Sequence, residues 1–240
     1  MIELINVSKT FTNPYKAILE NVNLTIKKGE FVCILGSSGV GKSTLLNMVA
    51  GLEKASSGKV MLNGKEIKGP GKDRVVMFQE SALFPWLTVS KNVQFGGKIA
   101  GVPVREREQR AEKYLEMVGL GEYKDYRIEQ LSGGMKQRVA LARALAMDSE
   151  VLLMDEPFSA LDGDTKHKLW DEVDHIRRET KKTVLMVTHS VKEAVFLADR
   201  IIELYPEHGG IKAEYQIEIK GNRKDHEQEM QEMIERITGN

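Results

Sequence analysis

A glycine-rich segment near the N-terminus carries the residue types that bind phosphate. Its eight residues are Gly36, Ser37, Ser38, Gly39, Val40, Gly41, Lys42 and Ser43. The glycines let successive backbone N–H groups point into one concavity that can cradle phosphate oxygens. A lysine at this place can reach the β- and γ-phosphates of a nucleotide, and the serine hydroxyl can bind Mg²⁺.

Two flanking elements must position this segment. An apolar run at 31–35 precedes it, and a helix-like run from Thr44 to residue 50 follows it. Strand, glycine loop and helix in this order are the context of a P-loop, or Walker A motif. The helix opening at Lys42 adds the positive end of its dipole to the same place. We therefore expect the loop and Thr44 to bind a nucleotide together with Mg²⁺.

A second motif places two carboxylates after another apolar run. Residues 151–154 are all apolar, and Asp155 and Glu156 follow directly. A buried parallel strand would deliver both acids to the carboxyl edge of a sheet, where ligands bind in open α/β folds. This is the Walker B arrangement, which predicts that Asp155 holds Mg²⁺ and that Glu156 activates the attacking water as general base.

A third motif resembles a second anion-binding helix start. Ser132 suits a helix N-cap, and Gly133 and Gly134 leave backbone N–H groups accessible. One nucleotide does not need two such sites from one chain. We therefore expect this second site to serve a nucleotide held by another copy of the chain.

The composition restricts the class of protein. The chain has 240 residues, 41% of them hydrophobic, and Lys plus Arg equals Asp plus Glu at 35 each. This balance gives no support for a nucleic-acid partner. Cys33 is the single cysteine and falls in an expected core strand, so a reducing, cytoplasmic compartment fits. No signal peptide is visible, and no apolar run approaches the ~20 residues that span a bilayer. Another chain must make any membrane crossing.

The remaining sequence alternates strand and helix patterns. Such alternation predicts a parallel sheet covered on both faces. Asn63-Gly64 predicts a hairpin, and Val102-Pro103 precedes a charged helix. The expected strands are 2–7, 22–26, 31–35, 59–62, 65–67, 74–78, 151–154 and 183–187, and the expected helices are 104–118, 164–178 and 191–198.

The last segment is polar but has one apolar helical face. Met230, Met233, Ile234 and Ile237 recur at helical spacing. We expect a polar C-terminal helix at about 223–238 that packs back onto its own domain. A partner-binding role is the alternative.

Taken together, these motifs resemble the ATP-binding cassette (ABC) ATPases, the motor subunits of ABC transporters. The segment 131–138, Leu-Ser-Gly-Gly-Met-Lys-Gln-Arg, is similar to their signature sequence. The resemblance covers residues 2 to about 220 and implies an α/β, P-loop NTPase (RecA-like) core with a mostly parallel sheet. It also implies an N-terminal antiparallel β subdomain and an inserted α-helical subdomain at about 82–148, within one domain spanning 1–240.

The resemblance assigns further roles. Gln79 matches the Q-loop glutamine, which is associated with Mg²⁺ and with signalling to the membrane partner. Residues 159–162 resemble the D-loop that crosses the dimer interface. His189 matches the switch histidine that contacts the γ-phosphate and orients Glu156 and water. The implied catalytic residues are Glu156, His189, Gln79 and Lys42, and the implied Mg²⁺ ligands are Ser43, Gln79 and Asp155.

An aromatic residue stacks on adenine in this family. Phe11 aligns best with that position, and Tyr15 is the competing candidate. Stacking on a π face discriminates poorly among bases, so the choice of ATP over GTP comes mostly from the resemblance.

A narrower resemblance concerns 69–79, 83–89 and 193–200, which are similar to the nitrate/sulfonate/taurine-type importer cassettes. The wider resemblance to ABC transporter ATPases implies a homodimer that sandwiches ATP on the cytoplasmic face of the membrane. Integral membrane permease subunits and a solute-binding protein would be its partners. The apolar cluster at 83–89 is the predicted docking surface for the permease. An exporter or lipoprotein-releasing cassette, or a soluble ABC ATPase in DNA repair or translation, are the alternatives.

Overall fold

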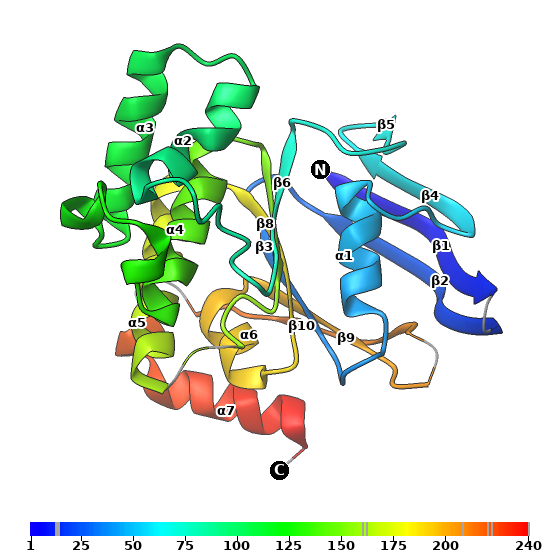
Figure 1. The fold of residues 1–240 in the computed structure, drawn as a ribbon. Helices are drawn as coiled ribbons and strands as arrows, with labels where there is room; N and C mark the ends of the chain where they lie inside the picture. The colour runs from blue at the N-terminus through cyan, green and yellow to red at the C-terminus, as the bar shows by residue number, and fades with distance from the viewer. Residues whose placement is uncertain are drawn as a thin grey trace. The chain divides into compact units, whose positions relative to one another are not determined.

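The computed structural model describes residues 1–12, 15–159, 161, 163–207, 209–219, 221 and 223–239, with the backbone alone of Thr12, Tyr15 and Lys16. These residues form two compact units (Figure 1). The first unit combines Met1–Gly71 with Arg177–Asn240 and is therefore discontinuous in sequence. The second unit is the continuous segment Lys72–Ile176.

The first unit contains a four-stranded antiparallel sheet in the order β2-β1-β4-β5. Asn63 and Gly64 have φ values of 49° and 75°, which suits the type I′ turns of two-residue hairpins. The hairpin predicted at this dipeptide is confirmed, because β4 pairs antiparallel with β5. The strands are β1 (Ile2–Thr12), β2 (Tyr15–Ile26), β4 (Ser57–Leu62) and β5 (Lys65–Glu66).

The predicted bounds of the first two strands were wrong. The strands expected at 2–7 and 22–26 are longer and pair from Ile2↔Ile26 to Thr12↔Tyr15. Register shifts interrupt this pairing between Leu4 and Val7 and again at Lys9, and Asn6 has a φ of 50°. Such bulges break the alternation of apolar and polar residues, so the pattern alone hid the length of both strands.

The first unit also contains a group of strands around β3 (Phe31–Leu35). Strand β3 lies between β8 (Thr183–Thr188) and β9 (Arg200–Leu204), parallel to both. All five residues of β3 are buried, as expected for a parallel strand covered on both faces. Strands β9 and β10 (Ile211–Gln216) pair antiparallel. The sequence pattern predicted neither β9 nor β10. Strand β9 is short and contains the charged residues Arg200 and Glu203, and β10 has no fully buried residue.

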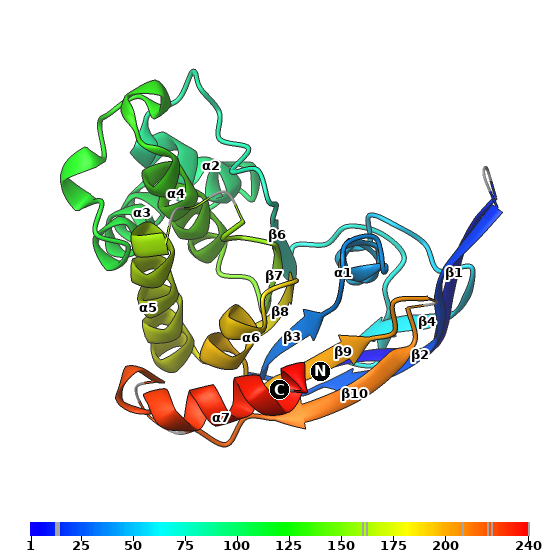
Figure 2. The same cartoon turned by 90° about the horizontal axis from the view of Figure 1, so that it is seen from below.

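The α-helices that lie wholly within the first unit, among the described residues, are α1 (Lys42–Ala50), α6 (Val191–Leu197) and α7 (Glu227–Thr238). The helix predicted at 223–238 is divided, because a 3₁₀ turn at Arg223–Asp225 precedes α7. The buried Arg223 donates to Val195 O at 3.3 Å and to Ala198 O at 3.0 Å. These bonds satisfy carbonyl groups at the end of α6. Helix α7 contacts α6 (Figures 1 and 2), so the C-terminal segment does pack onto its own unit.

The second unit joins two parallel strands to a group of helices. Strands β6 (Arg74–Met77) and β7 (Val151–Asp155) pair in parallel. Helices α2 (Val89–Ile99), α3 (Val104–Met117) and α4 (Gly133–Ala146) contact one another (Figure 2). Short 3₁₀ turns lie at Gly121–Tyr123 and Ile128–Gln130, and α5 (Gly163–Thr180) follows β7.

Parallel buried strands, an N-terminal antiparallel sheet and a helical segment confirm the predicted α/β P-loop fold class. Within the described ranges, no helix has both the length and the apolar character needed to span a bilayer.

Candidate nucleotide-binding site

The glycine loop connects β3 to α1 in the first unit. Gly41 has a φ of 108°, and a Cβ there would lie 2.8 Å from both Ile18 Cγ2 and Leu19 Cδ2 of β2. A side chain at this position would therefore be strained and would clash. The close approach presses the end of the loop against β2, and α1 begins at the next residue. No side chain caps this helix start, which leaves its N-terminal N–H groups oriented for an anion.

The lysine of the loop is buried and folds back along it. Lys42 Nζ donates to Gly36 O and to Ser37 O, each at 2.9 Å. These two carbonyls fix the ammonium inside the loop, whereas the side chains of Ser37, Ser38 and Ser43 are exposed. A positive charge thus lies where the sequence predicts that phosphates bind.

The neighbouring strand places His189 beside the loop. Leu35 and Thr188 are register partners in the parallel pair β3 and β8. The next residues, Gly36 and His189, therefore leave the sheet at the same edge. Ser190 N–H donates to Thr188 Oγ1 at 3.0 Å, and the Thr188 hydroxyl donates to the buried carboxylate of Glu193. These bonds fix the backbone on both sides of His189, whose side chain is exposed.

The two adenine candidates lie on the β1–β2 hairpin. Phe11 is 39% exposed, and Lys9 Nζ lies 4.8 Å from the centroid of its ring. Lys9 is itself held by Glu53 at 2.7 Å and by Lys54 O at 2.9 Å. The side chain of Tyr15 lies outside the described atoms. The choice of Phe11 over Tyr15 therefore stays a prediction.

The second unit brings Gln79, Asp155 and Glu156 together. Met77 and Met154 are register partners in the parallel pair β6 and β7. Gln79 and Glu156 each follow this pair by two residues and therefore leave the strands at the same edge. Glu156 has a φ of 42°, a conformation that costs about 1–3 kcal/mol in a residue with a side chain. Ser159 stabilises this turn, because its N–H and its Oγ donate to Glu156 O at 3.2 and 3.0 Å.

The signature segment begins α4 as predicted. Ser132 is the N-cap, and its Oγ accepts from Met135 N–H at 3.3 Å. A Cβ on Gly134 would lie 2.3 Å from Thr165 Cγ2, near the start of α5. Gly134 therefore permits close packing, whereas nothing lies near the corresponding position of Gly133. Of the predicted D-loop, Ala160 and Asp162 lie outside the described residues.

Sequence reasoning missed one residue that joins these segments. The buried Gln137 of α4 donates from Nε2 to Gln79 O at 3.2 Å and to Pro157 O at 2.7 Å. One side chain thus links the signature helix, the segment after β6 and the turn after β7. The available signal was an uncharged polar residue on the otherwise apolar, buried face of α4.

The oxygen ligands present suit a hard cation. In the part of the chain that the structure describes, no group of three or more His, Cys, Asp or Glu could hold a metal. Mg²⁺ does not require one, because it is usually held by one or two carboxylates together with substrate phosphates and water. The hydroxyl of Ser43, the amide of Gln79 and the carboxylate of Asp155 are the donor types expected for this role.

The fold and the glycine loop define a P-loop nucleotide-binding protein, and comparison with known proteins gives the family. The model of the family described as "ABC transporter" matches residues 19–159. The chain belongs to this family and is an ATPase of the ABC type.

Relatives with named roles are 43–51% identical to this chain over most of their length. The bicarbonate transport ATP-binding protein CmpD of Synechococcus elongatus is 51% identical over 201 residues, 82% of this chain and 72% of CmpD. The nitrate import ATP-binding protein NrtD of Synechocystis is 44% identical, covering 93% of this chain and 85% of NrtD. The taurine import ATP-binding protein TauB of Roseobacter denitrificans is 43% identical, covering 90% and 82%.

Solved structures agree with this assignment. The dimeric structure of MJ0796, a bacterial ABC transporter cassette, has a TM-score of 0.79 and 36% identity, covering 92% of this chain and all of that one. The same cassette is also known as a dimer in a post-hydrolysis state with ADP and Pi, at a TM-score of 0.78 and 35% identity, with the same coverage.

Proposed function

We propose that this ATPase powers the import of a small solute, such as nitrate, bicarbonate, a sulfonate or taurine, through a separate membrane permease. The names of CmpD, NrtD and TauB support this proposal, because NrtD and TauB are import proteins for nitrate and taurine and CmpD is a transport protein for bicarbonate. The protein would act peripherally on the cytoplasmic face of the membrane, with permease subunits and a solute-binding protein as partners.

The observation that carries the proposal is that the glycine loop and the signature segment each open a helix, at Lys42 and at Gly133. Two copies facing head to tail would hold each nucleotide between the glycine loop of one copy and Ser132 to Gly134 of the other. Dimeric structures of a related cassette support this arrangement.

The chemistry follows from the chain's own residues. N–H groups of the loop and Lys42 bind the phosphates and offset their charge. Glu156 takes a proton from water as the water oxygen forms a bond to the γ-phosphorus, and the bond from that phosphorus to the β–γ bridging oxygen breaks, yielding ADP and inorganic phosphate. His189 would orient the water and Glu156. Mg²⁺, held by Ser43, Asp155 and Gln79, would neutralise charge on the phosphates.

The docking surface for the permease is proposed at 83–89. The cluster contains a packed and an exposed aromatic residue. The ring centroid of Phe84 lies 4.3 Å from that of Phe95, whereas Trp86 is 68% exposed. Arg127 Nη1 donates to Trp86 O at 2.9 Å and fixes the backbone of the loop. An exposed aromatic residue on a fixed backbone is typical of a binding hot spot.

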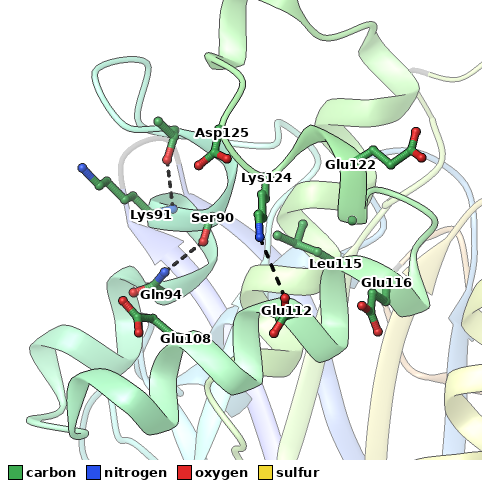
Figure 3. A pocket seen from close by; sticks show the side chains of 12 residues that line it. Ser90, Lys91, Gln94, Glu108, Glu112, Leu115, Glu116, Glu122, Lys124 and Asp125 are labelled. Atoms are coloured by element: carbon green, nitrogen blue, oxygen red, sulfur yellow. Dashed lines mark hydrogen bonds and ion pairs between the residues drawn. The ribbon is translucent and has the colours of Figure 1, made fainter.

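The charged residues on the surface beside 83–89 are mainly acidic. A hollow of about 610 Å³ opens between the start of α2, α3 and the 3₁₀ turn after it, and Lys124 and Glu112 approach within 3.9 Å across it (Figure 3). Cytoplasmic loops of membrane proteins are rich in Lys and Arg, so an acidic neighbourhood favours such a partner. The acidic residues lining the hollow are Glu108, Glu112, Glu116, Glu122 and Asp125.

Reconstitution tests this function. The chain is co-purified with its membrane subunits, placed in vesicles, and assayed for uptake of nitrate, bicarbonate or taurine with ATP. Uptake that disappears with Glu156→Gln supports the proposal. ATP-driven export, or an active ATPase that binds no membrane subunit, would refute it in favour of an exporter or a soluble ATPase.

Cysteine cross-linking from position 84 or 87 to the permease tests the docking surface, because Cys33, the single native cysteine, is buried. Thermal melting of Trp86→Ala accompanies it. A sharp drop in the melting temperature together with no cross-link would show that the cluster is core.

A further inference from the structure

Helix α4 holds the backbone that leads to the docking surface. Arg143 donates from Nη1 to Ala82 O at 2.8 Å and from Nη2 to Ser81 O at 2.9 Å. Its guanidinium carbon also lies 5.8 Å from the centroid of the Phe84 ring. The side chain therefore fixes two consecutive carbonyl groups and covers the aromatic residue that follows them.

A second contact from the same helix secures the start of this segment. Gln137 donates to Gln79 O at 3.2 Å. Carbonyl groups at 79, 81 and 82 thus all accept hydrogen bonds from side chains of α4. Helix α4 therefore holds the segment from Gln79 to Ala82, whereas Phe84 is held by α2, where its N–H donates to Asn92 Oδ1 at 2.8 Å.

The conformation of the segment explains why it has to be held. Ala82 has a φ of 43°, which is unfavourable for a residue with a Cβ and persists only where the surroundings impose it. Arg143 donates to the carbonyl of Ala82 itself. Release of this bond would let residue 82 relax and would change the direction of the chain that enters 83–89.

We propose that Arg143 is a positioning residue for permease binding, which presents Trp86 by fixing Ser81 and Ala82 to the signature helix. This inference rests on the proposed function, because it assigns a task to the docking surface at 83–89. Through this residue, α4, whose N-cap is Ser132, and the docking surface at 83–89 would move together. Arg143 would contact neither nucleotide nor permease.

The geometry distinguishes arginine from lysine at this position. A guanidinium offers two parallel N–H groups in a rigid fork, which can bridge adjacent carbonyl groups, whereas an ammonium is a point charge on a flexible stem. Arg143→Lys keeps the charge and most of the packing but loses the bridge. It is therefore the variant that tests positioning with little risk to folding.

The first measurement follows Trp86 in the full chain and needs no partner. The chain has two tryptophans, so Trp170→Phe leaves Trp86 as the sole reporter of the loop. We expect Arg143→Lys to increase the amplitude of nanosecond depolarisation in time-resolved anisotropy, because a loop held by fewer hydrogen bonds moves more on this timescale. The matched control is Arg110→Lys on α3, whose partners are Glu106 at 2.6 Å and Asp148 at 3.8 Å. Unchanged anisotropy in Arg143→Lys would overturn the inference.

The second measurement is the affinity for the permease in detergent. We expect Arg143→Lys to bind about tenfold more weakly, because binding must then order a loop that has lost the equivalent of about one hydrogen bond to a charged group. In a double-mutant cycle the effect should largely vanish in a Trp86→Ala background, because both changes act on the same surface. Additive effects would show that Arg143 acts elsewhere and would overturn the inference. Failure of the wild-type cassette to bind the permease would instead refute the proposed function, while the anisotropy still decides whether Arg143 holds the loop.

Discussion

The carboxylate of Glu172 provides a quantitative test of the packing between α4 and α5. Its Oε1 lies 3.2 Å from Arg138 Nη2, and its Oε2 is buried and has no hydrogen-bond partner among the described residues. Burial raises the pKa of Glu172 from 4.5 to about 7; Arg138 lowers it by less, and Asp171 adds to the rise. The perturbation is Glu172→Gln, which keeps the shape and removes the ionisation.

The expected magnitude follows from the two pKa values. In the unfolded chain the carboxyl loses its proton near pH 4.5, whereas the folded protein retains it until about pH 7. Between these values the folded state binds more protons, so stability falls as pH rises, and the loss is complete above the folded pKa. A difference of about 2.5 pH units corresponds to about 3 kcal/mol. The stability of Glu172→Gln relative to wild type should therefore rise by up to this amount from acid pH to pH 8.

Urea unfolding at pH 5, 6, 7 and 8 measures this difference, with the fluorescence of Trp170 on the same helix as the probe. The control is Glu112→Gln on α3, where the side chain is 62% exposed and no comparable rise is expected. A difference that stays constant from pH 5 to 8 would show that the ion pair with Arg138 cancels the effect of burial, and one that falls would show that the ion pair outweighs it. The reasoning would then be refuted.

Three further predictions concern nucleotide chemistry. Glu156→Gln should retain ATP binding, lose at least about a hundredfold in turnover because the amide cannot take a proton, and form an ATP-dependent dimer in size-exclusion chromatography; wild-type turnover would contradict the assignment. Lys42→Ala should weaken ATP binding in calorimetry and abolish hydrolysis with an unchanged circular dichroism spectrum, whereas intact affinity and turnover would leave the loop a purely structural turn. Ser132→Arg should abolish turnover but not binding by the single copy, and mixing it with Lys42→Ala should restore about one competent site per heterodimer; heterodimers without recovered activity would count against a shared site.

The sequence predicted the parts of the site that depend on local pattern. The glycine loop, the Ser132 cap and the Asn63-Gly64 hairpin each require particular residues at particular backbone angles, and these leave a signature within a few residues. The approach of His189 to the loop was also foreseeable, since parallel buried strands end at one edge of a sheet.

The sequence could not predict contacts made to distant backbone. Gln137 and Arg143 bind backbone carbonyl groups about 60 residues earlier in the chain. Every residue has such a carbonyl, so the sequence does not show which one accepts the bond. The bulges in β1 and the positive φ of Ala82 likewise depend on neighbours in space. The choice between Phe11 and Tyr15 depends on loop geometry that no periodicity encodes.

The discontinuity of the first unit has a consequence for how the protein is made. Strand β3 emerges early from the ribosome, but its partners β8 and β9 follow only after the whole of the second unit has been synthesised. At 5–20 residues per second, this delay is on the order of ten seconds. During that time Phe-Val-Cys-Ile-Leu is an apolar strand without its parallel neighbours, and such a segment pairs readily with other chains. We therefore expect the nascent cassette to be prone to aggregation at β3, the strand that leads into the phosphate-binding loop.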